Sequence, residues 1–208
     1  MCEYAALLRS VMDFSQFQYA CAISGGIGSG KSSACRILES MGYEIIDADK
    51  IAHKALEEQT SQIISIFGEE VLEGERISRA KLGKIVFKDS ILRQKLNELL
   101  SARIQEKLYE ECLRLEKRER WFFVEIALLF EQREIYNFLH SILIACSMDV
   151  QIERICQRNH LGCEEAKERI LAQMPLEQKL KMADRVIWNE GGLDALRDQL
   201  KLFLSEIV

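Results

Sequence analysis

The chain of 208 residues lacks the features that mark several large classes of protein. It has no apolar run of about eighteen residues, which a membrane-spanning helix requires, so we expect no membrane span. It has no excess of basic residues, and its formal net charge of −5 argues against binding to nucleic acid. No repeat, low-complexity tract or linker interrupts it, and its length is typical of one domain with small appended subdomains.

The sequence also lacks a Cys-x-x-Cys pair. Its 7 cysteines are spread along the chain, at positions 2, 21, 35, 112, 146, 156 and 163, and its 3 histidines show no metal-ligand spacing. Residues 1–18 form a short extension with an interrupted apolar stretch and one arginine, Arg9, which makes a poor secretion signal. We therefore expect reduced, mostly buried thiols in a cytoplasmic protein.

One glycine-rich stretch organises the rest of the chain. Gly25, Gly30, Lys31 and Ser32 occupy the fixed positions of G-x-x-x-x-G-K-[ST], the phosphate-binding P-loop or Walker A motif. The apolar run at 19–23 predicts a buried strand before the loop, and residues 31–40 predict a helix after it. A chance match, in which the lysine is merely solvated, is disfavoured because the motif lies in this strand–loop–helix context.

The motif has a direct chemical interpretation. Glycines let successive N–H groups turn inward, and the following helix directs its N-terminal dipole at the same anion. Lys31 is expected to reach the β- and γ-phosphates of ATP, and Ser32 to ligate Mg²⁺. The residues expected to bind the nucleotide through this loop are Gly26, Ile27, Gly28, Ser29, Gly30, Lys31, Ser32 and Ser33.

Four further apolar runs, at 43–47, 121–126, 141–145 and 183–188, alternate with helical patterns. Alternation at this spacing predicts a parallel, doubly wound α/β sheet. Residues 60–115 are charged and helical, with Ser90 as the expected N-cap of a long helix. The apolar stripe of that helix is expected to be core: Ile91, Leu92, Leu96, Leu99, Leu100, Ile104, Leu108 and Leu115.

Carboxylates stand where ligands bind in such sheets. Asp47 and Asp49 follow the second strand, so Asp49 could accept a proton from an attacking hydroxyl and Asp47 could hold a Mg²⁺-bound water. The alternative is that one of them caps the helix expected near Lys50. Glu125, at the end of a buried strand, could contact the ligands of Mg²⁺ without binding the ion itself, or it could form an ordinary surface ion pair.

Two short helices with clustered arginines follow the fourth strand. Residues 149–158 carry Arg154 and Arg158 on one face, and a second helix is expected to run up to Pro175, the only proline. Such helices beside a P-loop are typical of a lid over phosphates, because arginine offers a bidentate fork. The alternative is a solvated surface on which the arginines pair with Glu153, Glu164, Glu165 and Glu168. A final helix is expected over 193–207.

These segments in this order resemble the dephospho-CoA kinase family, from about residue 19 to the C-terminus. The most specific segments are the sequences Gly-Gly-Ile-Gly-Ser-Gly-Lys-Ser, Asp-Ala-Asp and Leu-Leu-Phe-Glu. The segments that carry the resemblance are 25–32, 46–49, 79–82, 86–87, 128–131, Arg154, Arg158, 173–175, 183–187, Asn189 and Gly191.

The resemblance implies phosphorylation of the ribose 3′-hydroxyl of dephospho-CoA by ATP and Mg²⁺. It implies a P-loop three-layer sandwich over 19–208 with a five-stranded parallel sheet, a helical acceptor-binding insertion at about 56–115 and a small helical lid at about 154–180. It assigns Asp49 as general base, Asp47 near the metal, Arg154 and Arg158 to the lid, and Asn189 with Gly191 to the turn near the adenine. The partners are then small molecules, and we expect a monomer or weak homo-oligomer.

The chain departs from the family pattern at two places, both on the acceptor side. Ser101-Ala102 stands where the family usually has His-Pro, and Ala127 stands where it usually has proline. The alternatives are another small-molecule P-loop kinase, of the nucleoside monophosphate or shikimate type, and a nucleotide-dependent switch. Neither the D-x-x-G nor the N-K-x-D string of GTPases occurs, which weighs against the switch.

Overall fold

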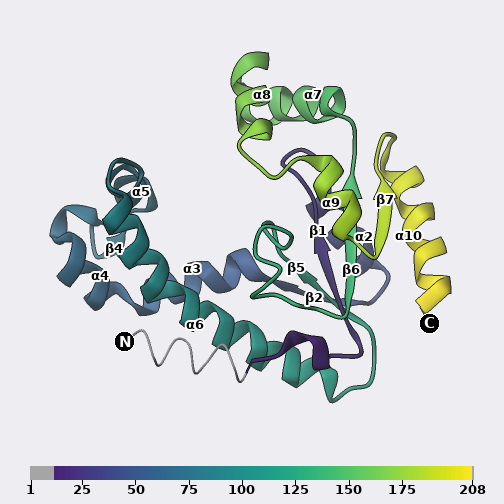
Figure 1. The fold of residues 1–208 in the computed structure, drawn as a ribbon, viewed down its shortest axis with the longest axis horizontal. Helices are drawn as coiled ribbons and strands as arrows, with labels where there is room; N and C mark the ends of the chain where they lie inside the picture. The colour runs from purple at the N-terminus through teal and green to yellow at the C-terminus, as the bar shows by residue number, and fades with distance from the viewer. Residues whose placement is uncertain (1–11, 208) are drawn as a thin grey trace. The chain divides into compact units, whose positions relative to one another are not determined.

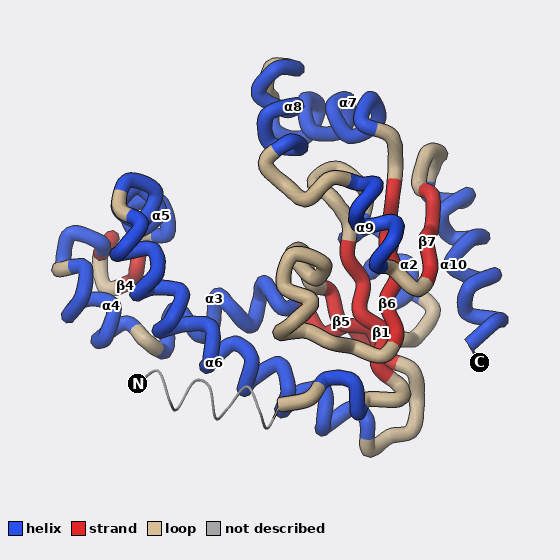
Figure 2. Tube along the Cα trace, in the orientation of Figure 1, coloured by secondary structure: helices blue, strands red, loops and turns tan. Residues whose placement is uncertain are grey.

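The computed structural model describes residues 12–207, which fall into two compact units that are treated separately below. The larger unit comprises residues 13–47 and 112–208 and contains the central sheet. The smaller is built around residues 48–111 and is mainly helical, as the blue segments of Figure 2 show. It includes most of the insertion predicted at about 56–115.

The larger unit is organised around a five-stranded sheet with the order β2-β5-β1-β6-β7, in which every pairing is parallel (Figure 1). This confirms the predicted α/β fold. The strands are β1 (Ala20–Ser24), β2 (Glu44–Asp47), β5 (Phe122–Glu125), β6 (His140–Ala145) and β7 (Arg185–Trp188). Because all strands run the same way, their carboxyl ends meet at one edge, where ligands bind in such sheets.

The helices of this unit are α2 (Lys31–Ser40), α7 (Met148–Asn159), α8 (Cys163–Leu171), α9 (Leu176–Met182) and α10 (Leu193–Ile207). The predicted bounds of α2 and α10 are confirmed. Both helices cover the same face of the sheet, where Leu38 and Leu200 pack in one cluster with Ile23 and Ile142. All four side chains are fully buried, as a sheet covered on both faces requires.

Aromatic residues that precede β1 also belong to the core of this unit. Phe14 and Phe17, around the short 3₁₀ helix η1 (Phe14–Gln16), are completely buried. The ring of Phe14 contacts those of Tyr136 and Phe138, and its backbone N–H donates to Asn137 Oδ1. Leu7, Leu8 and Val11, in the apolar stretch of the extension, lie outside the described residues.

The smaller unit consists of helices and one two-stranded hairpin. Its elements are α3 (Ala48–Glu58), α4 (Thr60–Phe67), η2 (Glu69–Val71), β3 (Leu72–Glu73), β4 (Arg76–Ile77), α5 (Arg79–Lys88) and α6 (Ser90–Glu116), the last of which continues into the larger unit. A compact apolar cluster joins them, with Leu56, Ile63, Phe67, Val71 and Leu82 as its buried members.

One expectation for α6 is wrong. Its N-terminus is capped by Asp89 instead of Ser90, because Asp89 Oδ1 accepts hydrogen bonds from the N–H groups of Ile91 and Leu92 at 2.8 and 3.0 Å. Its apolar stripe packs against the core along most of its length: Leu108 and Leu115 are buried, and Leu92, Leu96, Leu99 and Leu100 are half-buried against the apolar cluster of the smaller unit. Ile91, which is 66% exposed, is the exception.

The segment before β7 also differs from expectation. The second lid helix, α8, ends at Leu171 and does not reach Met174-Pro175. An additional short helix, α9, begins directly after Pro175, which stands at its N-cap. Gln173 therefore lies in the irregular connection between α8 and α9.

Candidate active site

The P-loop contains a tight turn at its tip. The N–H of Ser29 donates to the carbonyl of Gly26 at 3.0 Å, which closes a four-residue turn with Ile27 and Gly28 in the centre. Gly28 has φ of 78°, whereas Ile27 is not among the residues with positive φ. These angles identify a type II turn, in which the third position requires a glycine.

Lys31 and Glu125 form the charged centre of the loop. Lys31 Nζ lies 2.5 Å from Glu125 Oε1, and the two side chains are only 13% and 12% exposed. The hydroxyl of Ser32 donates to the same carboxylate oxygen at 3.0 Å. Both loop residues lie at the start of α2, so Glu125 holds them in place from the carboxyl end of β5. Of the two roles considered for Glu125, the ion pair is the one that these contacts show.

The residues near Lys31 fit a magnesium ion bound together with a nucleotide. Asp47 lies opposite Glu125 in the β2–β5 register, so oxygen donors of two neighbouring strands and of Ser32 meet at this edge. Among residues 12–207, no group of three or more His, Cys, Asp or Glu side chains could hold a metal by itself. Mg²⁺ suits such a donor set, because it is usually bound by one or two carboxylates, waters and substrate phosphates.

Side chains from distant segments hold the carbonyl groups of the loop. Arg154 Nη1 lies 3.4 Å from Gly28 O and 3.3 Å from Ser29 O, and its Nη2 lies 3.3 Å from Gly191 O. The buried side chain of Asn189 donates to Ser29 O at 2.8 Å. The structure thus brings together the predicted loop, lid and turn residues, and Asn189 contacts the backbone of the loop.

This contact explains one glycine of the motif. A Cβ atom at Gly30 would lie 2.1 Å from Asn189 Nδ2, and Gly30 has φ of 91°. Both the close approach and the left-handed backbone exclude a larger residue.

Two glutamines that the sequence analysis did not select also contact the loop. Gln151 Nε2 donates to Ile27 O at 2.7 Å, and Gln173 Oε1 accepts from Ile27 N at 2.8 Å. Gln151 is in the first turn of α7, and Gln173 follows α8, so the beginning and the end of the α7–α8 helix pair meet at Ile27. The resemblance included Gln173 only as part of a motif, without a role.

Glu131, the last residue of the Leu-Leu-Phe-Glu segment, anchors the far end of the lid. Its Oε1 accepts the N–H of Met174 at 3.3 Å and lies 2.8 Å from Lys179 Nζ. The side chain of Lys179 is 2% exposed, so this ion pair is well shielded from water. It holds the backbone beside Gln173 in place.

The other lid arginine lies differently. Arg158 is exposed, and its Nε donates to the neighbouring Asn159 Oδ1 at 2.9 Å. In α8, Arg169 pairs with Glu165 at 2.9 Å. Arg154 therefore contacts the loop directly in this structure, whereas Arg158 and Arg169 have local partners.

Asp49 lies in the first turn of α3, because that helix begins at Ala48 and not near Lys50. In the smaller unit it lines an open cavity of about 440 Å³ together with His53 and Arg79. Leucines 56, 82, 96 and 100 form part of the apolar lining. The cavity lining thus combines a carboxylate, an imidazole, a guanidinium and an apolar wall.

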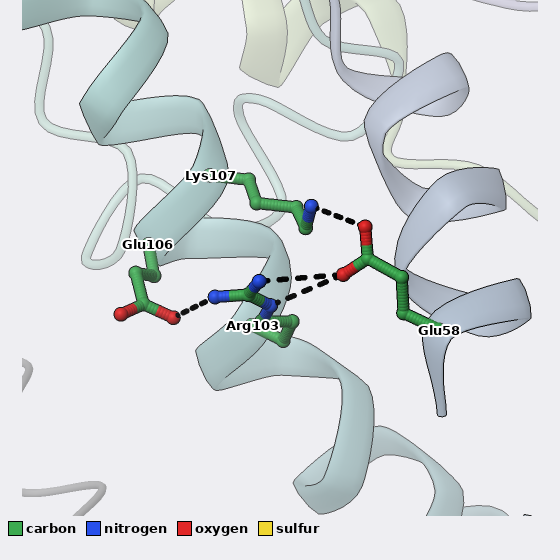
Figure 3. Close-up of polar contacts among 4 residues, drawn as sticks. All are labelled: Glu58, Arg103, Glu106 and Lys107. Carbon is green, nitrogen blue, oxygen red and sulfur yellow. Dashed lines mark hydrogen bonds and ion pairs between the residues drawn. The ribbon is translucent and has the colours of Figure 1, made fainter. Parts of the chain in front are cut away.

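A cluster of charges joins α3 to α6 in the same unit (Figure 3). Glu58 Oε1 lies 2.5 Å from Lys107 Nζ, and Glu58 Oε2 lies 3.3 Å from Arg103 Nη2. Arg103 also pairs with Glu106 at 2.6 Å. The hydrogen bond from Lys107, with help from Arg103, lowers the pKa of Glu58 below its usual value.

The six cysteines of the described chain are free thiols. Four of them are buried: Cys21, Cys35, Cys112 and Cys146. Burial raises the pKa of Cys146, beside the loop, to about 11, and burial likewise raises the pKa of Cys35. These thiols are protonated at neutral pH and pack as small apolar groups. No helix within residues 12–207 is long and apolar enough to span a membrane.

Comparisons with known proteins agree with this geometry. A sequence model of the family described as dephospho-CoA kinase matches residues 19–195. The dephospho-CoA kinase of Helicobacter hepaticus is 40% identical over 195 residues, covering 92% of this chain and 94% of the relative. That of Helicobacter pylori strain 26695 is 39% identical, covering 91% and 97%.

Two solved structures have the same fold. A crystal structure from Thermus thermophilus has a TM-score of 0.80 at 35% identity, with 91% of this chain and 97% of the other chain covered. The dephospho-CoA kinase from Campylobacter jejuni has a TM-score of 0.66 at 32% identity with the same coverage.

Proposed function

The chain belongs to the dephospho-CoA kinase family, and on this premise we propose that it transfers the γ-phosphoryl group of ATP to the ribose 3′-hydroxyl of dephospho-CoA, giving coenzyme A and ADP. The observation that carries the proposal is a complete P-loop whose lysine and serine share one carboxylate, Glu125, in a chain that matches the family over 19–195. In-line transfer needs positioning and charge stabilisation more than covalent chemistry from the protein.

Lys31 is the residue that we assign to the β- and γ-phosphate oxygens. Its ion pair with Glu125 holds the ammonium group at the loop, where it can contact the phosphates in place of the Glu125 carboxylate. Ser32 and Asp47 would hold Mg²⁺, with Glu125 beside them; when bound, the ion neutralises charge on the phosphate oxygens. The amides of Gly26 to Ser33 complete the nucleotide site.

Asp49 is the residue that we assign as general base. Its position on the wall of the cavity with Arg79 supports this role, because an acceptor bound there meets both a carboxylate and a guanidinium. As the hydroxyl oxygen bonds to the γ-phosphorus, its proton passes to the carboxylate and the bond from phosphorus to the ADP oxygen breaks. The helical region at about 56–115 would form the acceptor side.

Arg154 and Arg158 are proposed to serve the lid at about 154–180. Arg154 already lies on the loop, and its guanidinium is fixed by three carbonyl oxygens. Arg158 would approach the phosphates only when the lid closes, since its present partner is Asn159. Closure would also exclude water as a competing acceptor.

Two further properties belong to the proposal. The six free thiols support a reducing cytoplasmic setting. We also propose a monomer or weak homo-oligomer, which light scattering across a range of protein concentrations tests.

The test is ATP-dependent release of ADP in the presence of dephospho-CoA, with detection of coenzyme A by mass. The Lys31→Ala variant is the control for contaminating kinases. Coenzyme A formed by the wild type and absent with the variant supports the proposal. ATP binding without coenzyme A formation overturns it, and directs attention to other hydroxyl acceptors and to Ser101-Ala102 and Ala127.

A matched pair of variants then separates the two carboxylates. Asp49→Asn is expected to lower kcat by at least about 10²-fold with little change in ATP affinity, because general base catalysis contributes on the order of 10²- to 10⁴-fold. Asp47→Asn is expected to raise the Mg²⁺ concentration needed for half-maximal rate. Interchanged results would reverse the two assignments.

A further inference from the structure

We propose that Gln151 and Gln173 form a brace that fixes the orientation of the peptide groups on both sides of Ile27, and so keeps the P-loop in the conformation that binds phosphate. This inference rests on the proposed function, because it concerns how the loop of that active site is positioned. Neither glutamine is assigned a contact with substrate; both act through the backbone of Ile27.

The first step of the argument is that the two amides are complementary to one residue. An N–H group can only donate and a carbonyl can only accept, so Ile27 N requires the oxygen of Gln173 and Ile27 O requires the nitrogen of Gln151. The partners lie 146 and 124 residues away in sequence, at opposite ends of the α7–α8 helix pair. Local turn chemistry alone therefore does not supply these bonds.

The second step concerns what the bond to Ile27 O controls. The peptide between Ile27 and Gly28 is the central peptide of the type II turn, and rotating it by half a turn is what distinguishes type II from type I. In a trans peptide the carbonyl and the following N–H point in opposite directions. While Gln151 holds the carbonyl of Ile27 on its own side, the N–H of Gly28 points to the opposite side.

The third step explains the extra glycines of the motif. Gly26 and Gly28 occupy positions where G-x-x-x-x-G-K-[ST] accepts any residue. A Cβ atom at Gly26 would lie 2.7 Å from Gln151 Nε2 and 3.5 Å from Gln173 Oε1, and one at Gly28 would lie 2.9 Å from the Gln151 carbonyl. The loop is thus glycine-rich where the first turn of α7 and the two amides pack against it.

The fourth step is that the backbone at or beside each glutamine is held by hydrogen bonds. Gln151 is 8% exposed and lies in the first turn of α7, where its N–H bonds to Ser147 O. Gln173 adjoins Met174, whose N–H is bonded to Glu131. A brace on these supports can transmit the position of the lid to the loop, so Ile27 becomes the point at which lid and loop are coupled.

The test uses the same substitutions at both positions, because they should have opposite results. Glutamate keeps the acceptor that Ile27 N needs but removes the donor that Ile27 O needs, and lysine does the reverse. Gln173→Glu and Gln151→Lys are therefore expected to keep MgATP binding within about threefold of wild type. Gln151→Glu and Gln173→Lys are expected to weaken MgATP binding by about tenfold or more. In the first variant the carbonyl of Ile27 faces another acceptor, and in the second the N–H of Ile27 faces another donor, so a part-buried backbone group is left without a hydrogen bond.

The two glutamate variants add the same charge at nearly the same place, and so do the two lysine variants, because the side chains at 151 and 173 both contact Ile27. The direct effect of the added charge on a bound phosphate is thus the same for the two glutamate variants, and likewise for the two lysine variants. The difference in MgATP affinity between the two variants with the same new residue therefore reports the hydrogen bond to Ile27. Gln157→Glu and Gln178→Glu, on exposed positions of α7 and α9, control for charge on those helices. Thermal unfolding of every variant verifies that each is folded.

MgATP affinity is measured by titration calorimetry without acceptor, and kcat is measured separately in the coenzyme A assay. Because the brace acts on the loop, KM for ATP is expected to change more than KM for dephospho-CoA. Equal losses for glutamate at both positions, or for lysine at both, would overturn the brace. A wild type that binds MgATP but forms no coenzyme A would instead overturn the proposed acceptor and leave the calorimetric test valid.

Discussion

The ion pairs of Lys31 and Lys179 in the larger unit are shielded more strongly than the Glu58 charge cluster of the smaller unit. In the larger unit, Lys31 and Glu125 are 13% and 12% exposed, and Lys179 is 2% exposed beside Glu131. In the smaller unit, the carboxylate of Glu58 is 43% exposed, and its partners Arg103 and Lys107 are 36% and 20% exposed. The larger unit shields these two ion pairs, although others, such as Arg169–Glu165, are exposed, and the smaller unit leaves the Glu58 cluster more open to water.

This difference indicates how each unit contributes to the reaction. Charges in a shielded site interact more strongly and need no rearrangement of water when the phosphoryl group moves. The open cavity lined by Asp49 and Arg79 instead suits reversible entry of a large acceptor. We therefore expect variants of the shielded charges in the larger unit to change the rate of transfer. Variants of the smaller unit, apart from the proposed base Asp49, should change acceptor affinity and stability.

The largest effect is expected from Lys31→Ala. Loss of the ammonium group should lower kcat/KM for coenzyme A formation on the order of 10³-fold, because it removes preorganised charge from the phosphates. It should also destabilise the protein, since Glu125 is left shielded from water without its cationic partner. The measurements are steady-state kinetics and thermal unfolding.

The double variant Lys31→Ala/Glu125→Gln separates these two consequences. It removes the unpaired charge, so the melting temperature should recover toward that of the wild type while activity stays lost. Recovery of activity in the double variant would contradict the role assigned to Lys31.

A smaller effect is expected from Arg154→Ala, which should lower kcat by about 10²-fold and also weaken ATP binding. Arg154 contacts the carbonyls of Gly28 and Ser29, so its loss relaxes the loop as well as removing charge. Arg158→Ala is the matched comparison on the same helix: we expect it to lower kcat but to leave ATP affinity unchanged. Kinetics combined with calorimetry distinguish the two, and unchanged turnover in both variants would remove them from the site.

These expectations also show how much of the molecule was predictable from sequence. The loop, α2, the parallel strands and α10 depend on local patterns: a fixed motif, apolar runs and helical periodicity. Residues 31–40 and 193–207 form helices where predicted. The Asp89 cap and helix α9 also carried local signals, an aspartate before Ile91 and a proline before Leu176, that were assigned differently.

The brace was not predictable in the same way. In the sequence, Gln151 and Gln173 carry no signal of a shared role, and no spacing encodes their meeting at Ile27 in the folded chain. The same holds for Lys179, an unremarked lysine that becomes almost completely buried against Glu131. For α6, periodicity identified the apolar stripe, but only the tertiary structure decides which part of the stripe is covered.

The acceptor side is tested by Arg79→Ala. Arg79 lines the cavity from the first turn of α5, and a guanidinium there can pair with the diphosphate of dephospho-CoA. We expect KM for dephospho-CoA to rise by about tenfold, with ATP affinity and melting temperature unchanged. Lys84→Ala, on the same helix but outside the cavity lining, is the matched control. An equal rise in both variants would show a general effect of charge, and would weaken the contrast between the two units.

The smallest effect is expected from Glu58→Gln, which removes the acceptor of the charge cluster in Figure 3. The partners lower the pKa of Glu58 in the folded protein, so the ionised group stabilises the fold above its ordinary pKa of about 4.3. This contribution is lost as the pH falls through the lowered pKa. At pH 7 the variant should melt roughly 1–3 °C below the wild type, since exposed ion pairs contribute little.

The difference between wild type and Glu58→Gln should therefore shrink below about pH 4, and also at high salt. Glu110→Gln, at an exposed carboxylate of α6, the helix that carries Arg103 and Lys107, is the control and should show a smaller pH dependence. A difference that stays constant from pH 7 to pH 3 would mean that Glu58 acts through packing and not through its charge. The smaller unit would then resemble the larger one in how it uses its polar side chains, and the contrast between them would be confined to the nucleotide site.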